Sequence, residues 1–382
     1  MILRRISPAA VFLLSLILSG CGPAATKPDL DIQLAAGIHP RVYFACEQSM
    51  ARLDALFSGN EVINDLQRIG GGVSLAIQDF SVDRAAIVQR LNRAGIPVIA
   101  WMALPQDQGY YLNAENAEQA KAWFQDFLHW TDSAKLQWAA VGLDIEPNLN
   151  EFAAIRKDGG FKLVLTILGR TISLSRNHLV RKATNDYNDL VGEIHAHGYP
   201  VQTYQFPFVA DEREVGSTVL DRVAGLVPLA VDTEVLMTYS SFRHDLGSAL
   251  VANYGAKAGG IAIGSTSEAA DSSLNSKFSA LNWEQFSNDL ITAAHFSKIV
   301  GVYSLEACVH RGFLAKMKNF NWQQPVHIPG SAITATAHFR AMVQRVIWIS
   351  TYWIYVLLGL VALIVLLIWQ IRKLRKKPAK PV

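Results

Sequence analysis

Short apolar or β-branched runs recur eight times along the chain, with helical stretches between them. The runs are apolar throughout, which is typical of parallel strands that are covered on both faces. The segments between them, such as Arg84–Ala94, Glu115–Thr131 and Trp283–Ser297, have the 3.6-residue spacing of amphipathic helices. The predicted strands are Arg41–Cys46, Val73–Phe80, Pro97–Leu104, Ala139–Ile145, Pro200–Phe206, Glu234–Tyr239, Gly260–Gly264 and Ile299–Leu305.

Eight strand–helix units favour a closed (β/α)8 TIM barrel over an open doubly wound sheet. No glycine-rich phosphate-binding motif follows the first strand, as an open dinucleotide-binding fold requires. Glycines at 95, 198 and 259 stand between a helix and the next strand, where a helix ends. We therefore predict an α/β TIM barrel over residues 38–325.

The amino-terminal segment is typical of an export signal. Arg4 and Arg5 precede the apolar run Val11–Leu18, which is too short to span a bilayer. The ending Leu18-Ser19-Gly20-Cys21 resembles the lipobox of bacterial lipoproteins. That resemblance implies a signal peptide over 1–20, lipidation of Cys21 and a tether over 21–37. The alternative is an ordinary signal peptide with an incidental cysteine.

A second apolar segment lies near the carboxyl terminus. Val346–Trp369 is 24 residues long, with Ser350 and Thr351 as its polar interruptions, and predicts a transmembrane helix after a linker over 326–345. The tail over 370–382 is basic, so the positive-inside rule places it in the cytoplasm. We expect a single-pass protein of the cell membrane whose barrel is extracytoplasmic, in the periplasm or at the cell surface. The alternative is a buried core helix.

The net charge of the chain limits the kinds of partner that it can bind. The chain has 35 Lys and Arg against 32 Asp and Glu, and removing two basic residues of the signal and six of the tail leaves 27 against 32. This mildly acidic body has no basic stripe, which argues against nucleic acid as a partner.

Cys46 ends the first predicted strand and Cys308 follows the eighth, and these two strands are neighbours in a closed barrel. Either a disulfide or two buried thiols is expected.

The sharpest chemical signal lies at the end of the fourth strand, because a TIM-barrel active site occupies the carboxyl ends of the strands. Asp144 and Glu146 are two residues apart, so both side chains point to the same face. Two acids in an apolar mouth repel each other, and one should keep the proton that a general acid needs. This pattern suggests a glycosidase site. The alternative is that one acid binds backbone at the rim and the other is solvated.

Other residues near the strand ends are candidates for binding a sugar. Aromatic side chains pack against sugar rings, and amides and carboxylates take hydrogen bonds from their hydroxyls. Tyr239 and Trp101 are expected to contact substrate, whereas Tyr303 is also a candidate for the core. No cofactor and no zinc site are predicted, since His195 and His197 face different directions on a helix. The predicted substrate-binding set is Trp101, Tyr204, Gln205, Asp79, Tyr303, Glu306 and Glu47.

Three segments together resemble the family-18 glycoside hydrolases, the chitinase-like barrels. They are Gly142-Leu143-Asp144-Ile145-Glu146, Met237-Thr238-Tyr239 and Gly301-Val302-Tyr303-Ser304-Leu305-Glu306. The resemblance implies a glycan-directed TIM barrel with Glu146 as general acid, Asp144 as its orienting partner and Tyr239 near the reacting carbon.

The acidic motif of that family is incomplete in this chain. The fourth strand supplies two acids where the family has four, and Ser240 stands where the family has a sixth-strand Asp. Matching the motif on Gly142 instead would put Asn148 at the acid position. The motif therefore leaves Glu146 and Asn148 as two alternatives for that position.

The sequence as a whole predicts a membrane-anchored glycoside hydrolase that acts on envelope or extracellular polysaccharide. One alternative is an inactive barrel that binds glycan or scaffolds a polysaccharide export or assembly complex. Another is a metal-assisted hydrolase with Glu47, Asp144 and Glu146 around Mg²⁺ or Ca²⁺.

Overall fold

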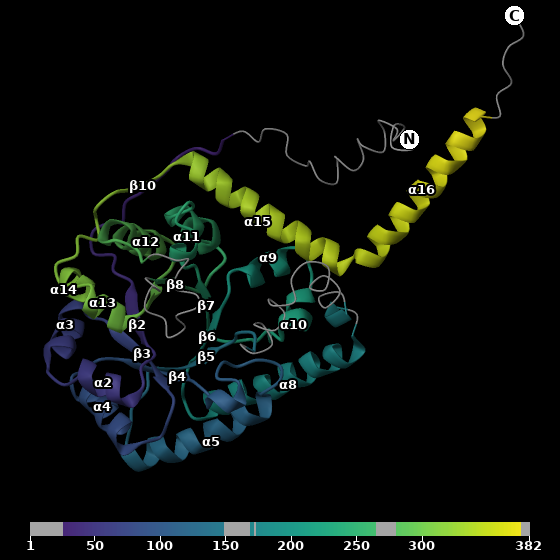
Figure 1. Ribbon diagram of the computed structural model, residues 1–382. Helices are drawn as coiled ribbons and strands as arrows, with labels where there is room; N and C mark the ends of the chain where they lie inside the picture. Colours follow the sequence, from purple (N-terminus) through teal and green to yellow (C-terminus); the bar gives the residue numbers. More distant parts are fainter. Residues whose placement is uncertain (1–25, 149–168, 172, 265–279, 376–382) are drawn as a thin grey trace, which may run out of the picture.

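The predicted TIM barrel is confirmed. The computed structural model describes residues 26–148, 169–171, 173–264 and 280–375, so Cys21 and the predicted signal peptide lie outside the described residues. Eight parallel strands close in chain order (Figure 1). They are β2 (Arg41–Cys46), β3 (Gly72–Ile77), β4 (Val98–Met102), β5 (Ala140–Asp144), β6 (Val201–Gln205), β7 (Thr233–Met237), β8 (Gly260–Gly264) and β9 (Ile299–Tyr303). Each corresponds to a predicted strand and ends at the predicted residue or slightly before it.

Helices surround the barrel (Figure 1). Local signals explain where they begin. The Ser81 hydroxyl accepts a hydrogen bond from the Arg84 amide at the start of α4, and Asn282 and Gln285 form a capping box at the start of α12. The helices are α2 (Met50–Leu56), α3 (Glu61–Ile69), α4 (Val82–Arg93), α5 (Ala117–Ala134), α8 (Leu174–Ala196), α9 (Phe208–Glu214), α10 (Val219–Ala224), α11 (Ser248–Gly255), α12 (Trp283–Phe296), α13 (Leu305–His310) and α14 (Phe313–Met317).

Each barrel strand presents two different faces. Outward residues such as Phe44, Leu75 and Val141 are fully buried and form one continuous core with the helices. Inward residues such as Trp101 and Met237 belong to separate small clusters inside the barrel. The helix-facing side of the strands therefore carries the main hydrophobic core, which leaves the interior side available for polar residues.

A small two-stranded sheet lies beside the barrel. β1 (Leu30–Ile32) pairs antiparallel with β10 (Val326–Ile328), and Leu30 is opposite Ile328. Ile32 and Val326 are buried in a cluster with residues of α11 and α12. Parts of the predicted tether and linker are thus folded against the body. Strands of three residues carry too short a pattern to be predicted from the sequence.

A long helix, α15 (Gly330–Thr351), connects the barrel to the carboxyl-terminal segment. It packs along α9, α10 and α11. Arg340 of α15 forms an ion pair with Asp211, which is fully buried, with 2.8 Å between Nη2 and Oδ1. Arg340 also donates through Nη1 to the Asn253 carbonyl oxygen at 2.8 Å, and its guanidinium lies over the Tyr254 ring. These contacts fix α15 to the outside of the barrel.

The carboxyl-terminal helix α16 (Trp353–Arg375) leads away from the barrel (Figure 1). Its segment Trp353–Arg372 is long and apolar enough to cross a membrane, and none of it is buried in the described part of the protein. The predicted span over 346–369 covers the end of α15 and most of α16, and the two helices are separated at Tyr352.

Removing the Arg340 side chain tests the attachment of α15. Arg340→Ala leaves the Asp211 carboxylate buried without its cation, and we expect the free energy of unfolding to fall by about 3–5 kcal/mol. Denaturant titration of the full chain in detergent measures this. The matched control is Arg213→Ala, since the bidentate pair of Arg213 with Glu234 has similar geometry but a 55% exposed Arg side chain. Arg213→Ala should lower the free energy of unfolding by no more than about 1 kcal/mol. Equal decreases in the two variants would contradict the expected role of Arg340.

Candidate active site

Three carboxyl side chains converge on the mouth of the barrel, at the carboxyl ends of its strands. Asp144 is the last residue of β5, and Glu146 follows it on the same inward face. Glu47 follows β2, which lies across the barrel from β5. Asp144 is 3% exposed, whereas Glu146 and Glu47 are partly buried. We refer to these three groups as the mouth carboxyls.

The mouth carboxyls hold their protons more tightly than carboxyls in water. Burial raises the pKa of Glu146 to about 8, and the charge of Glu47 adds to this. Burial also raises the pKa of Asp144 well above its ordinary value, with further contributions from Glu146 and Glu47. Burial raises the pKa of Glu47 although tyrosine hydroxyls oppose the change. Near neutral pH the mouth therefore contains at least one protonated carboxyl that can act as an acid.

Tyrosines hold Glu47 in place. The Tyr303 hydroxyl donates to Oε2 of Glu47 at 2.7 Å, and the Tyr111 hydroxyl lies 3.5 Å from Oε1. Tyr110 packs edge-on against Tyr111, and its hydroxyl accepts from Nε2 of Gln78 at 2.8 Å. Tyr303 ends β9 and is joined to Ser304 by a cis peptide bond. The carboxylate of Glu47 is thus oriented by side chains from two other parts of the mouth.

Aromatic rings from β4, β6 and the end of β7 line the same interior. The Trp101 and Tyr204 ring centroids are 6.2 Å apart, and those of Tyr239 and Tyr303 are 5.9 Å apart. The Tyr204 hydroxyl is 2.9 Å from that of Ser74. Space for the Tyr204 ring comes from Gly142 on the neighbouring strand, because an added Cβ there would lie 2.9 Å from Cε2 of Tyr204. The structure therefore brings the predicted Trp101, Tyr204, Tyr239 and Tyr303 together with the mouth carboxyls.

Several buried polar atoms at the mouth have no hydrogen-bond partner among the described residues. They are Oδ1 of Asp144, Nε1 of Trp101 and Oε2 of Glu306, whose other oxygen accepts from Nε2 of Gln48 at 2.9 Å. Trp101 is only 5% exposed. Since buried polar groups in proteins are normally paired, these atoms mark a place where a polar ligand would supply the missing partners.

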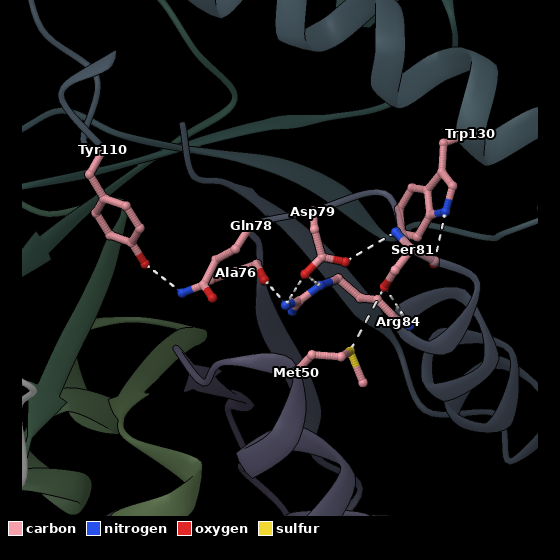
Figure 2. A network of polar contacts seen from close by, with 8 residues as sticks. All are labelled: Met50, Ala76, Gln78, Asp79, Ser81, Arg84, Tyr110 and Trp130. Atoms are coloured by element: carbon pink, nitrogen blue, oxygen red, sulfur yellow. Dashed lines mark hydrogen bonds and ion pairs between the residues drawn. The ribbon is translucent and has the colours of Figure 1, made fainter. Parts of the chain in front are cut away.

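Two predicted binding residues lie elsewhere. Asp79 is bound to Arg84, whose Nη2 donates to Oδ2 at 2.8 Å, and Figure 2 shows this pair beside Gln78, which instead reaches Tyr110. These hydrogen bonds outweigh the effect of burial and lower the pKa of Asp79. Gln205 follows Tyr204 directly, so its side chain leaves β6 on the outer face, next in register to Leu236 of the helix-facing core. The side chains of Asp79 and Gln205 therefore lie on the opposite face of their strands from the mouth carboxyls.

Of the two alternatives for Cys46 and Cys308, the structure has the pair of free, buried thiols. Cys308 lies inside α13, because the chain turns into a helix directly after β9 and carries the cysteine beyond the strand end. Of the two residues considered for the acid position, Glu146 has the raised pKa. Asn148 donates instead to Oε2 of Glu115 at 3.3 Å.

A buried acid that was not predicted lies behind the mouth. Asp289 of α12 is 1% exposed and accepts hydrogen bonds from the hydroxyls of Ser240 and Ser248. Burial raises its pKa to about 6. An acidic residue on the apolar face of a predicted helix, between Phe286 and Ala293, is the sequence signal that could have identified it.

A cavity of about 240 Å³ lies beside Asp289. Its lining comes from the loop after β7, from α11 and α12, and from the segment around β10 and the start of α15, and none of the mouth carboxyls is among its lining residues. We place the candidate site at the mouth because the reactive carboxyls gather there. No group of three or more His, Cys, Asp or Glu side chains within the described ranges is arranged to hold a metal ion.

No protein-family model matches the chain, and no curated protein matches it in sequence. Solved structures with a related barrel include the PgaB (BpsB) glycoside hydrolase domain from Bordetella bronchiseptica, with 11% identity, coverage of 73% of this chain and 98% of that one, and a TM-score of 0.39. A family 2 AP endonuclease from Brucella melitensis has 14% identity, 72% and 98% coverage and a TM-score of 0.40. A GH5-4 broad specificity endoglucanase from an uncultured bacterium has 15% identity, 69% and 85% coverage and a TM-score of 0.38. At these values the comparisons carry no argument about activity.

The raised pKa of Glu146 predicts a pH-dependent effect on stability. Its folded-state pKa of about 8 exceeds the ordinary 4.5, so the contribution to stability is present at acid pH and is lost as the pH rises through that interval. Glu146→Gln removes this loss. We expect the variant to melt at the same temperature as the wild type in acid and higher above neutrality, by roughly 2–4 °C per kcal/mol relieved.

Thermal unfolding of both proteins across the pH range measures the difference. The control is Asp79→Asn, which should behave in the opposite way because the pKa of Asp79 is lowered. Its destabilisation should be present at neutral pH and fade as the pH falls. A Glu146→Gln variant that melts below the wild type at alkaline pH would contradict the assignment.

Proposed function

We propose that the protein is a glycoside hydrolase that uses Glu146 as its general acid. The observation that carries this proposal is the raised pKa of Glu146 at the barrel mouth, with Asp144 beside it and Glu47 opposite. Hydrolysis of a glycosidic bond needs a carboxylic acid that is protonated near neutral pH and a second carboxylate close to the sugar. In this proposal Glu146 supplies the first and Asp144 or Glu47 the second, in a barrel whose strand ends commonly carry catalytic groups.

Each residue has a distinct role in this mechanism. Glu146 donates its proton to the oxygen of the bond that breaks, and Asp144 orients Glu146 and stabilises positive charge that develops on the sugar. Glu47, held by Tyr303, provides a further negative charge across the mouth. Tyr239 hydrogen-bonds the group attached to the reacting carbon, while Trp101 and Tyr204 shape the sugar site. These roles match the resemblance to family-18 hydrolases at Asp144, Glu146 and Tyr239.

The proposed substrate is a polysaccharide outside the cytoplasm. The apolar segment Trp353–Arg372 and the basic residues that follow it support a membrane anchor with a cytoplasmic tail. The signal-like amino terminus with Cys21 supports export and lipidation. Two attachments would keep the barrel at the membrane surface, where envelope polymers are assembled and exported.

A second candidate is a catalytically inactive barrel that binds glycan for an export or assembly complex. The observation in its favour is Ser240, which stands where the family-18 motif has an acid and whose hydroxyl is bound to Asp289. Under this alternative the mouth would bind saccharide without cleaving it.

Incubation of the full chain in detergent with envelope and amino-sugar oligosaccharides tests the two candidates, with mass spectrometry to detect products. We expect cleavage whose rate falls as the pH rises above about 8, where Glu146 loses its proton. Glu146→Gln should reduce the rate by about 10²–10⁴-fold.

The control is Glu234→Gln, because Glu234 lies near the opposite end of the barrel and pairs with Arg213. It should cleave at the wild-type rate. Binding without any cleavage would favour the inactive barrel, and cleavage that survives Glu146→Gln would remove Glu146 from the mechanism.

A further inference from the structure

Among the described residues, the charged groups that act on the mouth carboxyls are other acids. The charged groups that shift the pKa values of Glu47, Asp144 and Glu146 are carboxylates of the same mouth, and Glu306 lies next to Glu47. The other ionisable groups that face them are tyrosines whose own pKa values burial and these carboxylates raise: Tyr110, Tyr111, Tyr204, Tyr239 and Tyr303. The described part of the mouth thus gathers acids, several of them protonated near neutral pH, that a bound cation would help to ionise.

Nearby arginines do not neutralise this charge. In the described segments that follow β3, β5 and β7, Arg84 pairs with Asp79, Arg176 with Glu115 and Arg243 with Asp245. Each of these cations is held by an acid that is not a mouth carboxyl. A ligand that brings its own positive charge would therefore meet carboxylates without displacing a protein cation.

Unpaired atoms at the mouth also point to a ligand. Oδ1 of Asp144 is a buried acceptor without a well-aligned donor in the described part of the chain, and the nearby group that lowers the pKa of this carboxyl is the Trp101 indole. Trp101, more than nine-tenths buried, has its indole N–H near the Asp144 carboxyl and its ring beside that of Tyr204. Carboxylate acceptors next to aromatic faces are the combination that binds an ammonium group, through charge-assisted hydrogen bonds and cation–π contact.

We propose that the mouth selects saccharides that carry free, protonated amino groups over N-acetylated or acidic ones. The inference rests on the proposed function only in taking the mouth as a sugar site, and it concerns binding rather than cleavage. An ammonium group supplies the donors and the charge that the mouth lacks. An acetamido group supplies one N–H and no charge, and a uronic acid brings a negative charge toward three carboxyls, which is unfavourable.

Binding of an ammonium sugar has a specific proton signature. A cation near the mouth favours the ionised form of the carboxyls, so protons bound by Glu146 and Asp144 in the free protein are released. A neutral sugar provides no such charge and releases few or none. Proton release can be read from calorimetric titrations in buffers with different ionisation enthalpies.

The experiment titrates the full chain in detergent with glucosamine tetrasaccharide, N-acetylglucosamine tetrasaccharide and galacturonic acid tetrasaccharide near neutral pH. We expect the glucosamine oligomer to bind at least about tenfold more tightly than the others, which corresponds to about 1.4 kcal/mol. Its binding should release protons and weaken with salt. Glu47→Gln should reduce the preference several-fold, whereas Glu234→Gln, distant from the mouth, should leave it unchanged.

Each outcome is decisive for the inference. Equal or tighter binding of the N-acetylated or acidic oligomer, or no binding of the glucosamine oligomer, overturns it. Tetralysine serves as a test of simple charge attraction, and the inference also fails if it binds as tightly as the glucosamine oligomer. Preferential binding of the glucosamine oligomer without its cleavage supports this inference while the proposed hydrolase function fails. Cleavage without preferential binding of the glucosamine oligomer supports the proposed hydrolase function and overturns this inference.

Discussion

The alternation of side chains along the strands of a closed barrel is the constraint on which the rest of this structure depends. Every second residue faces the helices, and those residues supply the main hydrophobic core, as Phe44, Leu75 and Val141 do. The remaining residues face a closed interior where volume is scarce. Glycine on one strand, such as Gly142, makes room for a large ring on the next. Because the outer face supplies most of the burial, the inner face can carry carboxyls and tyrosines at modest cost to the fold.

Burial of several acids in one mouth has a further consequence. Ionised carboxyls in an apolar environment are unfavourable, and the molecule avoids much of that penalty by keeping protons on them. The Tyr303 hydroxyl partly compensates Glu47, whereas Asp144 keeps an oxygen without a partner. The same arrangement that opposes ionisation retains an acidic proton at neutral pH. Burial of the mouth carboxyls is thus the common cause of the reduced stability and of the acidic proton retained at neutral pH.

Much of the fold followed from the sequence, because eight apolar runs with helical spacing between them leave few arrangements. The pairing of Asp144 with Glu146 followed from their two-residue spacing. The outward directions of Gln205 and Asp79 could not be predicted, because the sequence places a strand end only to within a residue or two, and one position reverses the side chain. The pairing of β1 with β10 joins segments almost 300 residues apart through three-residue strands, which no local pattern reveals. The roles of Asp289 and Asp211 depend on neighbours from distant helices.

The position of Asp289 bears on whether this residue could replace the acid that is missing from the sixth-strand part of the family-18 motif. Its carboxylate reaches Ser240 from α12, on the outer side of the strand wall, and it shares that place with Ser248 at the start of α11. A carboxylate there can fix the segment that directly follows Tyr239, but it cannot contact a sugar bound inside the barrel. Asp289 therefore does not replace the missing sixth-strand acid in the reaction. Under the proposed function, the acids that the described part of the mouth offers are Asp144, Glu146 and Glu47, and Glu47 directly follows the first barrel strand, outside the family motif.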